Sequence, residues 1–418
     1  MSQKTINMRE VVKNAILAAL VMAILTVPVI GLRLSVESTG LVLRTEMFWP
    51  LVAIAVVFFG RLILPFIHLP KFSAKESIAK IVPRVTGHHK IWIGALIVFA
   101  VALPFTPPGS SMLTGLTMAM IYMLLAVGLN IVVGYAGLLD LGHAAFYAIG
   151  AYTYALLNQY FGLSFWQALP LAGAMAAFFG IVLGFPVLRL RGDYLAIVTL
   201  GFGEIVRLLL NNWDSLTGGP DGVTNISKPT VFGFEITRRA RGEGETLWQF
   251  LGVDFASTYQ LTALYFIGLF LVIVAVFLIH RLSKMPVGRA WEALREDEIA
   301  CRSLGLNPTM IKLTAFSLGS MFAGFAGAFY AAYLGSVTPD SFAFIESAII
   351  LSIVVLGGMG SQRGVLLAAL ILTLLPEFAR DFAEYRMLIF GLVMVLMMIW
   401  RPQGLWPATR RHVELPAS

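Results

Sequence analysis

The side chains of this sequence that could do chemistry are ionisable groups placed in long apolar runs. Glu204 and Arg207 are three residues apart, so on a helix they lie on one face and can neutralise each other. A charged side chain in the hydrocarbon of a bilayer costs about 3 kcal/mol, so such residues normally face a bundle interior or an aqueous path. The pair therefore predicts either a structural ion pair or a polar position on a transport path, and both interpretations stay open. Glu346, near the end of another apolar run, is expected to reach headgroups or water.

A second group of candidates surrounds a glycine-rich interruption of the apolar stretch 129–152. Asp140 and His143 flank Gly142 there. Broken helices at membrane depth are tolerated only where protein or a water-filled path receives the freed backbone groups. Asp140 can cap such freed amides or take part in transport, and the sequence does not separate the two roles. The candidate residues of a translocation path or of helix breaks are Asn130, Gly137, Asp140, Gly142, His143, Thr199, Gly203, Glu204 and Arg207.

Motifs of the common enzyme and nucleotide sites are absent from the sequence. No glycine is followed directly by lysine, so the chain has no phosphate loop of the ATPase type, and H-E-x-x-H and G-x-S-x-G are also missing. The single cysteine, Cys301, excludes a disulfide scaffold and a multi-cysteine metal site. The glycine-rich run 357–364 lies between apolar runs and predicts a tight turn. We expect no catalytic residue, no metal and no cofactor in this chain.

The composition sets the class of protein. Of the 418 residues, 58% are apolar and only 13% are charged, which is too few to cover the surface of a soluble domain. The net charge of +7 comes from Lys and Arg residues that gather in short segments between apolar runs, and this placement favours a membrane protein over a nucleic-acid-binding one. The sequence therefore predicts an all-α polytopic membrane protein.

The apolar runs predict the membrane spans, since a helix needs about 20 residues to cross the hydrocarbon layer. Convincing spans lie near 13–32, 47–68, 91–106, 112–133, 144–161, 165–187, 259–280, 312–334 and 386–400. Weaker spans, with charges or with Gly and Pro, lie near 194–210, 342–357 and 364–379. We expect about ten to twelve crossings, with residues 1–90 as an accessory transmembrane hairpin plus a basic linker and 91–410 as the transport core.

The basic residues predict the orientation. Most of the 30 Lys and Arg residues fall on one side if both termini, including the tail 411–418, are cytoplasmic. Both 188–193 and 281–311 are basic, so an even number of spans must lie between them. The segment 194–210 should therefore cross the membrane despite its charges, and the loop 211–258 should be periplasmic.

The segment 286–305 predicts a short helix outside the membrane. Proline starts it, Gly305 ends it, and Glu298 and Arg302 are spaced to pair along it. An apolar stripe on one side comprises Trp291, Leu294, Cys301 and Leu304. Such a helix either rests on the bilayer or binds a protein partner. Four acidic residues within 292–298 favour the partner, because an anionic leaflet would repel them.

Several motifs carry a resemblance to a known family. The run 298–305 resembles the cytoplasmic coupling loop of bacterial ABC-transporter permeases, whose signature is E-A-A, three residues, then G, although its glutamate lies one position farther from the glycine. Longer runs resemble the permease subunits of branched-chain amino acid ABC importers, specifically the longer of the two paired permeases, over about 91–410. These runs are 129–152, 191–207, 216–222 and 355–361. Residues 1–90 resemble the extra hairpin on such permeases in Gram-negative bacteria.

The resemblance implies a heteromeric importer of Leu, Ile and Val in the inner membrane. Its partners would be a second permease, two cytoplasmic ATP-binding subunits, a periplasmic substrate-binding protein and the lipid bilayer, with no nucleic acid. The residues expected to couple this chain to the ATPases are Arg289, Glu292, Glu296, Glu298, Arg302 and Gly305. The alternatives are an ion-coupled secondary transporter with Glu204, Arg207 or Asp140 as the relay, an ABC permease for urea or short amides, and an accessory subunit.

Overall fold

The structure, a computed structural model, divides into two compact units, Met1–Ala95 and Leu96–Ser418. The residues it describes are 32–37, 40–45, 104, 110–187, 192–231, 233–237, 246–250, 252, 255–378, 391, 395 and 404–406. In the first unit, strands β1 (Leu32–Glu37) and β2 (Gly40–Thr45) form an antiparallel hairpin. The hairpin occupies the connection between the first two expected spans, which the sequence analysis did not assign to strands. Those spans lie outside the described residues, apart from Leu32.

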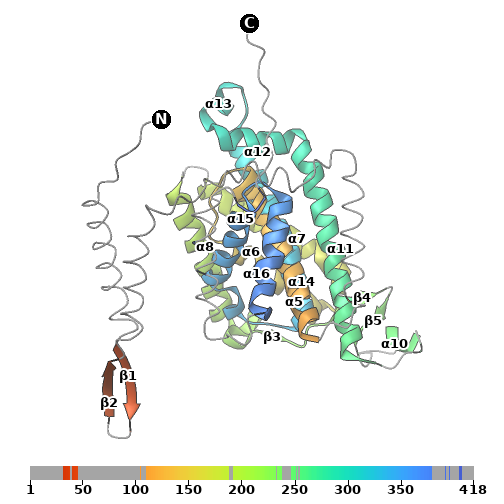
Figure 1. Cartoon of the computed structure of the whole chain (residues 1–418). Coiled ribbons are helices and arrows are strands. Elements are labelled where there is room, and N and C mark those ends of the chain that lie inside the picture. Colours follow the sequence, from red (N-terminus) through yellow and green to blue (C-terminus); the bar gives the residue numbers. More distant parts are fainter. Residues whose placement is uncertain are drawn as a thin grey trace, which may run out of the picture. The chain divides into compact units, whose positions relative to one another are not determined.

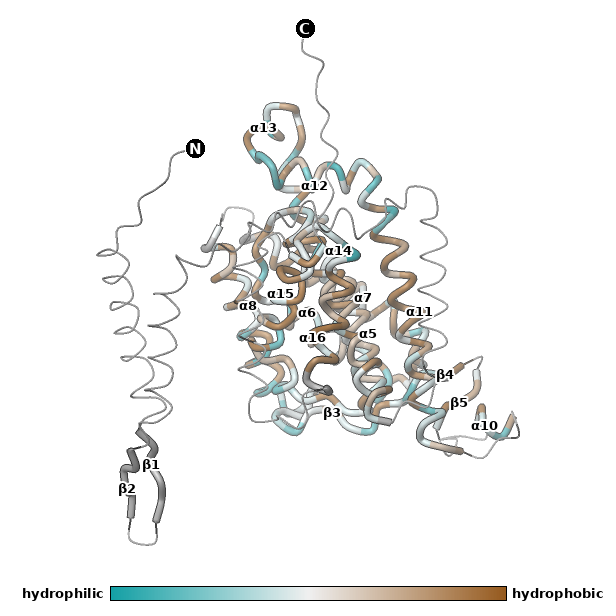
Figure 2. The backbone as a smooth tube through the Cα atoms, viewed as in Figure 1, coloured by the Kyte–Doolittle hydropathy of each residue, from teal (hydrophilic) through white to brown (hydrophobic). Residues whose placement is uncertain are grey.

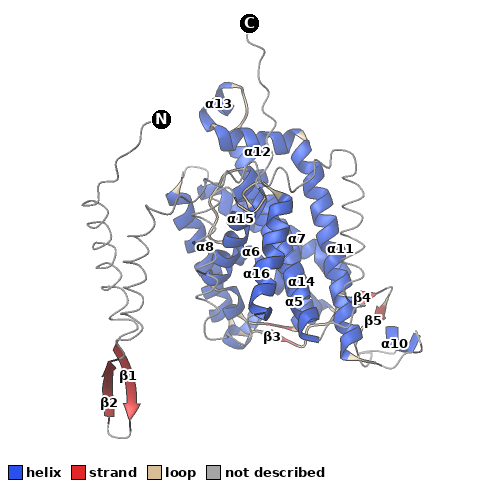
Figure 3. Cartoon of the chain, in the orientation of Figure 1, coloured by secondary structure: helices blue, strands red, loops and turns tan. Residues whose placement is uncertain are grey.

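The second unit is a bundle of long helices that run alternately in opposite directions (Figures 1 and 3). The long helices are α5 (Ser110–Leu129), α6 (His143–Phe161), α7 (Phe165–Val187), α8 (Asp193–Asn212), α11 (Ser257–Lys284), α14 (Pro308–Leu334), α15 (Phe344–Gly357) and α16 (Gln362–Phe378). Among the described residues, 6 helical segments are long and apolar enough to cross a membrane. The predicted class, an all-α polytopic membrane protein, is confirmed.

The three segments predicted as weaker spans form the helices α8, α15 and α16. Helix α8 is continuous through 194–210, as the count of crossings required. Helix α15 has only 14 residues, and a 3-10 turn, η5 (Pro339–Phe342), precedes it. The runs near 91–106 and 386–400 and the tail 411–418 lie almost wholly outside the described residues, so the number of crossings stays a prediction.

Helix α14 forms the centre of the bundle and packs against α5, α6 and α7. Glycines on its surface allow this approach: a Cβ added to Gly327 would lie 2.1 Å from the carbonyl oxygen of Tyr147 on α6. In the same interface a Cβ on Gly150 would lie 2.4 Å from Cα of Gly324. Small residues that let two helix backbones touch are the usual packing device inside membranes. The bundle core is therefore built by close backbone contact as well as by apolar side chains.

Two short helices, α12 (Pro286–Glu296) and α13 (Glu298–Ser303), stand at one end of the bundle, and the short strands stand at the other (Figure 1). Figure 2 shows α11 as mainly hydrophobic along its middle, whereas hydrophilic residues gather in α12 and α13. Gly192 and Glu296 line one pocket, which places the start of α8 and the α12 segment at the same end. The predicted parity of the spans between 188–193 and 281–311 is thus confirmed.

The described parts of the loop 211–258 lie at the opposite end and are tied to the helices. The elements there are α9 (Asp214–Thr217), η4 (Gly219–Asp221), β3 (Val223–Thr224), β4 (Thr230–Val231), β5 (Phe234–Glu235) and α10 (Leu247–Phe250). Strand β3 pairs antiparallel with β6 (Ser336–Val337), which follows α14. The Tyr154 hydroxyl on α6 donates to the carbonyl oxygen of Ser227 at 2.6 Å, and burial lowers the pKa of the neighbouring Lys228. The loop is held against the helix ends rather than forming a separate domain.

Candidate functional site at the coupling segment and the broken helix

Helix α12 turns its apolar stripe toward the bundle. Trp291 is fully buried and its indole Nε1 donates to the Thr314 hydroxyl of α14 at 3.1 Å, while Leu294 is buried beside it. A helix resting on the bilayer would turn this stripe outward to lipid, which the burial of Trp291 and Leu294 disfavours. Leu304, expected on the same stripe, is 79% exposed. The burial of Trp291 and Leu294 anchors α12 on the transport core and leaves its polar side facing outward.

The segment 286–305 is two helices, which corrects the prediction of one. Asp297 adopts an extended backbone conformation between α12 and α13. Its carboxylate accepts from the backbone N–H groups of Ile299 at 2.7 Å and Ala300 at 3.1 Å, and it thereby caps the start of α13. Capping of this kind makes a break after Glu296 stable, since the new helix start has its freed donors satisfied. Gly305, with a left-handed φ of 78°, follows the end of α13 as expected.

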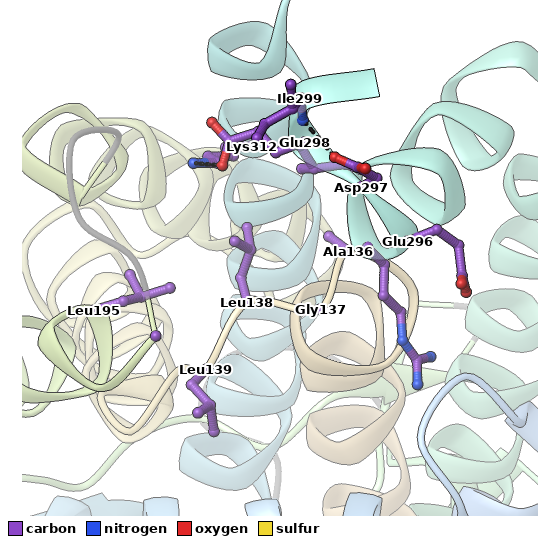
Figure 4. Close-up of a pocket in the computed structure, with 13 residues that line it drawn as sticks. Ala136, Gly137, Leu138, Leu139, Leu195, Glu296, Asp297, Glu298, Ile299 and Lys312 are labelled. Atoms are coloured by element: carbon purple, nitrogen blue, oxygen red, sulfur yellow. Dashed lines mark hydrogen bonds and ion pairs between the residues drawn. The ribbon is translucent and has the colours of Figure 1, made fainter. Parts of the chain in front are cut away.

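Glu298 joins α13 to the core through a cation that the sequence analysis did not single out. Its carboxylate lies 3.0 Å from the Arg302 guanidinium, the predicted pair, and 3.3 Å from Nζ of Lys312 on α14. Lys312 is only 4% exposed, so Glu298 forms an ion pair with a buried side chain of the core. Glu298 and Lys312 line a pocket of about 390 Å³, which Gly137 and Leu138 also line. Figure 4 shows the ion pair between Glu298 and Lys312 beside this pocket. The pocket brings the coupling segment and the glycine-rich interruption together.

Arg295, also absent from the predicted coupling residues, connects α12 to two turns of the core. Its guanidinium donates to the carbonyl oxygen of Gly134 and, at 3.5 Å, to that of Met359. A Cβ on Gly137 would lie 2.8 Å from Cγ of Arg295, so the absence of a side chain there makes room for the arginine. The spacing of Arg295 four residues after Trp291 put it on the buried face of α12, and this signal was available in the sequence.

The glycine-rich interruption is a break between α5 and α6, and we call residues 130–142 the core break. It begins as a π-helix, η3 (Asn130–Tyr135). Oδ1 of Asn130 accepts from the backbone N–H of Gly360 at 2.9 Å, which ties the core break to the turn between α15 and α16. A Cβ on Gly134 would lie 1.9 Å from that same Oδ1. Only glycine at position 134 therefore allows the amide of Asn130 to reach the turn.

Side chains from three segments bind the backbone of the core break and of the first turn of α6. Oδ1 of Asp140 accepts from the N–H of Gly142 at 2.9 Å, and its Oδ2 lies 3.1 Å from Nδ1 of His143. The Thr199 hydroxyl of α8 accepts from the N–H of Leu141 at 2.9 Å. On the other side, the Ser347 hydroxyl of α15 accepts from the N–H of Ala144 at 2.9 Å. Asp140 thus has the capping geometry, and Thr199 belongs to the same arrangement.

Some buried polar atoms around the core break have no hydrogen-bond partner within the described part of the chain. They are Nδ2 of Asn130, Nε2 of His143 and the hydroxyl of Tyr152. All of these atoms are closed off from solvent in this conformation. They can bind a cargo molecule or water only if the helices around them separate.

Glu204 and Arg207 lie away from the pocket, on α8. The Arg207 guanidinium lies 3.0 Å from the Glu204 carboxylate and 3.8 Å from that of Asp340 in η5. The predicted mutual neutralisation is therefore present. Gly203, by contrast, lies on the side of α8 that faces the core break, since its added Cβ would be 3.4 Å from Cα of Gly142.

Glu346 is partly exposed, and its predicted contact with headgroups or water stays a prediction. Its carboxylate accepts from the Tyr122 hydroxyl of α5 at 2.8 Å, in partly buried surroundings. The two residues are 224 positions apart, so no local pattern could have paired them.

Residues 111–398 match a protein family described as "Branched-chain amino acid transport system / permease component". The chain is also 52% identical over 408 residues to the high-affinity branched-chain amino acid transport system permease protein LivM of Escherichia coli, covering 96% of each chain. The chain belongs to this permease family. It is therefore a subunit of a transporter and a multi-pass membrane protein, as the resemblance of its motifs indicated.

Other relatives extend this family assignment. LivM of Salmonella typhimurium is 52% identical over 411 residues, which are 97% of this chain and 96% of the relative. The permease protein LivH of Escherichia coli is 25% identical over 304 residues, which are 70% of this chain and 94% of LivH. Residues 10–103 match a second family, described only as a domain of unknown function. No solved structure matches the chain.

Proposed function

We propose that this permease is one of two membrane subunits of an ABC importer that carries Leu, Ile and Val across the inner membrane of a Gram-negative bacterium. The relatives named LivM are described as permeases of high-affinity branched-chain amino acid transport systems, which supports this cargo. LivH, described as a permease of such a system, has a related sequence, which supports a second permease of similar fold as the partner. Residues 91–410 would form the transport core, and residues 1–90 would be accessory.

The observation that carries the proposal is the exposed tip of the coupling segment. Beyond the buried Trp291, apolar side chains are exposed on α13, on the turn after it and at the start of α14, and exposed charged side chains stand on α12 and α13. The exposed apolar residues are Ile299, Leu304, Leu306 and Met310, and the exposed charged residues are Arg289, Glu292, Glu296 and Arg302. An apolar centre with a charged rim is typical of a protein interface. Two cytoplasmic ATPases, one on each permease, would bind such tips and supply the energy.

Motion of this tip would reach the core through Arg295 and Glu298. Both residues bridge from the coupling segment to the core, one to the carbonyl of Gly134 and the other to Lys312. At the opposite end, the loop 211–258 would receive the cargo from a periplasmic substrate-binding protein. ATP hydrolysis on one side and cargo delivery on the other thus act on the two ends of the same helices.

The geometry disfavours the ion-coupled alternative. Arg207 is paired with Glu204, and both carboxylate oxygens of Asp140 already bind groups of the core break. A proton or sodium relay needs a carboxylate that alternates between two partners, and these carboxylates have fixed local ones.

The experiment is to replace Leu304 with Asp in the complete transporter, with Leu304→Met as the matched control. Because the side chain is 79% exposed, the chain should still fold and copurify with the second permease. We expect Leu304→Asp to lose ATPase copurification and ATP-driven leucine uptake by about tenfold or more, and Leu304→Met to lose neither. Full ATPase binding and uptake by Leu304→Asp would contradict the proposal. Competition of the uptake by isoleucine and valine, but not by urea, checks the cargo.

A further inference from the structure

Four segments line the pocket beside the Glu298–Lys312 pair, which we call the coupling pocket. They are residues 136–139 of the core break, Gly192 and Leu195 at the start of α8, residues 294–299 of the coupling segment, and Lys312 of α14. The volume of about 390 Å³ falls within the range of small-molecule sites, about 300 to 1,000 Å³. Leu139 and Ile299 on its walls are 38% and 67% exposed, so solvent reaches the pocket.

Lys312 supplies a buried positive charge at this pocket. Its side chain is 4% exposed, and within the described part of the chain its ammonium has one hydrogen-bond acceptor, Oε2 of Glu298 at 3.3 Å. An ammonium has three N–H donors, and its hydrogen bonds to carboxylates are usually about 2.8 Å long. Lys312 therefore retains donors for a further acceptor, such as the carboxylate of a ligand in the pocket.

The start of α8 adds a second group that attracts a carboxylate. Gly192 precedes the first residue of α8, and no side chain caps the helix from that position. The first N–H groups of a helix have no acceptor within the helix, and they carry the positive end of its dipole. A Cβ added to Gly192 would meet no atom within 4 Å, so a ligand can approach these groups.

The remaining walls of the coupling pocket are apolar and acidic. In Figure 4, Leu139 and Leu195 lie in the lower half of the view and Asp297 and Glu298 in the upper half. The acidic run 296–298 attracts an ammonium and disfavours a ligand that is only an anion. The leucine side chains accept an aliphatic group. An aliphatic amino acid carries a carboxylate, an ammonium and an aliphatic side chain, and so it matches each of these walls.

We propose that the coupling pocket binds a zwitterionic aliphatic amino acid from the ATPase side of the membrane and that the bound molecule slows transport. The proposal rests on the proposed function, since a molecule of this chemistry is the imported product. A ligand in the pocket touches the coupling segment, the core break and α8 at once, and so it fixes their spacing. It therefore favours the conformation in which the pocket is open over one in which these segments have shifted. Import would slow as its product accumulates.

The direct test is photolabelling with L-photo-leucine, a leucine analogue with a diazirine in its aliphatic side chain. The complete transporter in membranes is irradiated with this probe in the absence of the substrate-binding protein, and labelled peptides are located by mass spectrometry. We expect label within 136–139 or 294–299, and we expect excess L-leucine to prevent it. Label only elsewhere in the chain, or pocket label that excess L-leucine leaves unchanged, overturns the proposal.

Two variants locate the binding to the pocket. Lys312→Gln removes the ammonium, and Leu139→Ala shortens an apolar wall while keeping the Glu298–Lys312 pair, so it reports on the pocket even where Lys312→Gln does not fold. We expect pocket label to fall about tenfold in each variant. Lys284→Gln, at the exposed end of α11, is the matched control and should not change it. Undiminished pocket label in Leu139→Ala would contradict the assignment.

The regulatory step is measured as uptake of labelled valine into vesicles that contain ATP and L-leucine, relative to the uptake of the same protein without internal leucine. We expect internal L-leucine to slow uptake about fivefold. Isocaproate, which lacks the ammonium, and isoamylamine, which lacks the carboxylate, should not slow it. Leu139→Ala should need about tenfold more internal leucine for the same effect. Uptake that internal leucine does not slow, or slows equally in Leu139→Ala, overturns the regulation.

These outcomes are distinguishable from failure of the proposed function. A transporter that imports leucine but carries no label in the pocket refutes only this inference. A transporter that does not import leucine refutes the proposed function, whatever the label shows.

Discussion

The core break and the junction at Asp297 are both interruptions between helices, and they are stabilised in opposite ways. At the core break, side chains from α8 and α15 bind the backbone, and Asn130 binds the turn at Gly360. At Asp297 the backbone donors are satisfied by that one side chain, and the junction is exposed. The backbone of the first interruption is held by tertiary contacts, whereas the backbone of the second is capped by the Asp297 side chain alone, with Arg295 and Glu298 on either side of it contacting the core.

This difference indicates which of the two interruptions can move independently of the rest of the bundle. A junction whose backbone is capped locally can change its angle at the cost of few contacts elsewhere, which here include the Glu298–Lys312 pair. A junction held from several helices can move only if those helices move together, which suits a switch between two arrangements. Arg295 spans the two regions, because it belongs to α12 and binds the carbonyl of Gly134. We expect variants to affect the transporter most at the core break and least at Asp297.

The largest effect is expected for Gly142→Ala, which adds a methyl group to the core break. The new Cβ would lie 2.0 Å from the carbonyl oxygen of Thr199, and neither backbone can yield without moving α6 or α8. We expect a loss of about 3 kcal/mol or more, seen as a lower melting temperature of the purified complex. Gly201→Ala is the matched control, since its Cβ meets open space. Equal melting temperatures of the two variants would show that the core break is not tightly held.

An intermediate effect is expected for Arg295→Ala. Two carbonyl oxygens lose a charged donor, which costs about 2 kcal/mol at the contact between α12 and the core. We expect the complex to assemble and hydrolyse ATP, while leucine uptake per ATP hydrolysed falls about tenfold. Arg295→Lys should recover part of the uptake, and Arg281→Ala, at the exposed end of α11, should change nothing. A parallel loss of hydrolysis and uptake would instead assign Arg295 a purely structural role.

The smallest effect is expected for Asp297→Ala, which removes the cap of α13. The loss of about 1 kcal/mol is confined to a 6-residue helix, so the melting temperature should not change. Faster hydrogen exchange of the amides of residues 298–303 is the expected signature, and Asp297→Asn should retain most of the protection. A large drop in melting temperature would mean that the junction is coupled to the core more tightly than its hydrogen bonds indicate.

The sequence predicted helices far better than it predicted contacts. The expected span 165–187 coincides with α7, and 144–161 begins one residue after the start of α6. These helices were predictable because apolar runs bounded by polar residues and Gly determine where a membrane helix begins and ends. The split at Asp297 was missed because three consecutive acidic residues are compatible with a helix interior as well as with a cap.

The partners of Arg295 and Glu346 were missed for a different reason. The carbonyls that bind Arg295 lie 161 and 64 residues away, and they become acceptors only after α5, α12 and α15 have packed. Long-range pairs of this kind leave no local periodicity. The candidate site could thus be located to segments from the sequence, whereas the specific link between them required the structure.

The pairing of β3 with β6 connects the loop at the outer end of the bundle to the core helices. Strand β6 leads through η5 into α15, and the hydroxyl of Ser347 on α15 holds the start of α6. Binding at the outer end that shifted these elements would act on the start of α6, and by thermodynamic reciprocity a shift of α6 would change the affinity of the outer end by the same factor. In the proposed importer, the nucleotide state of the ATPases would thus change the affinity for the substrate-binding protein.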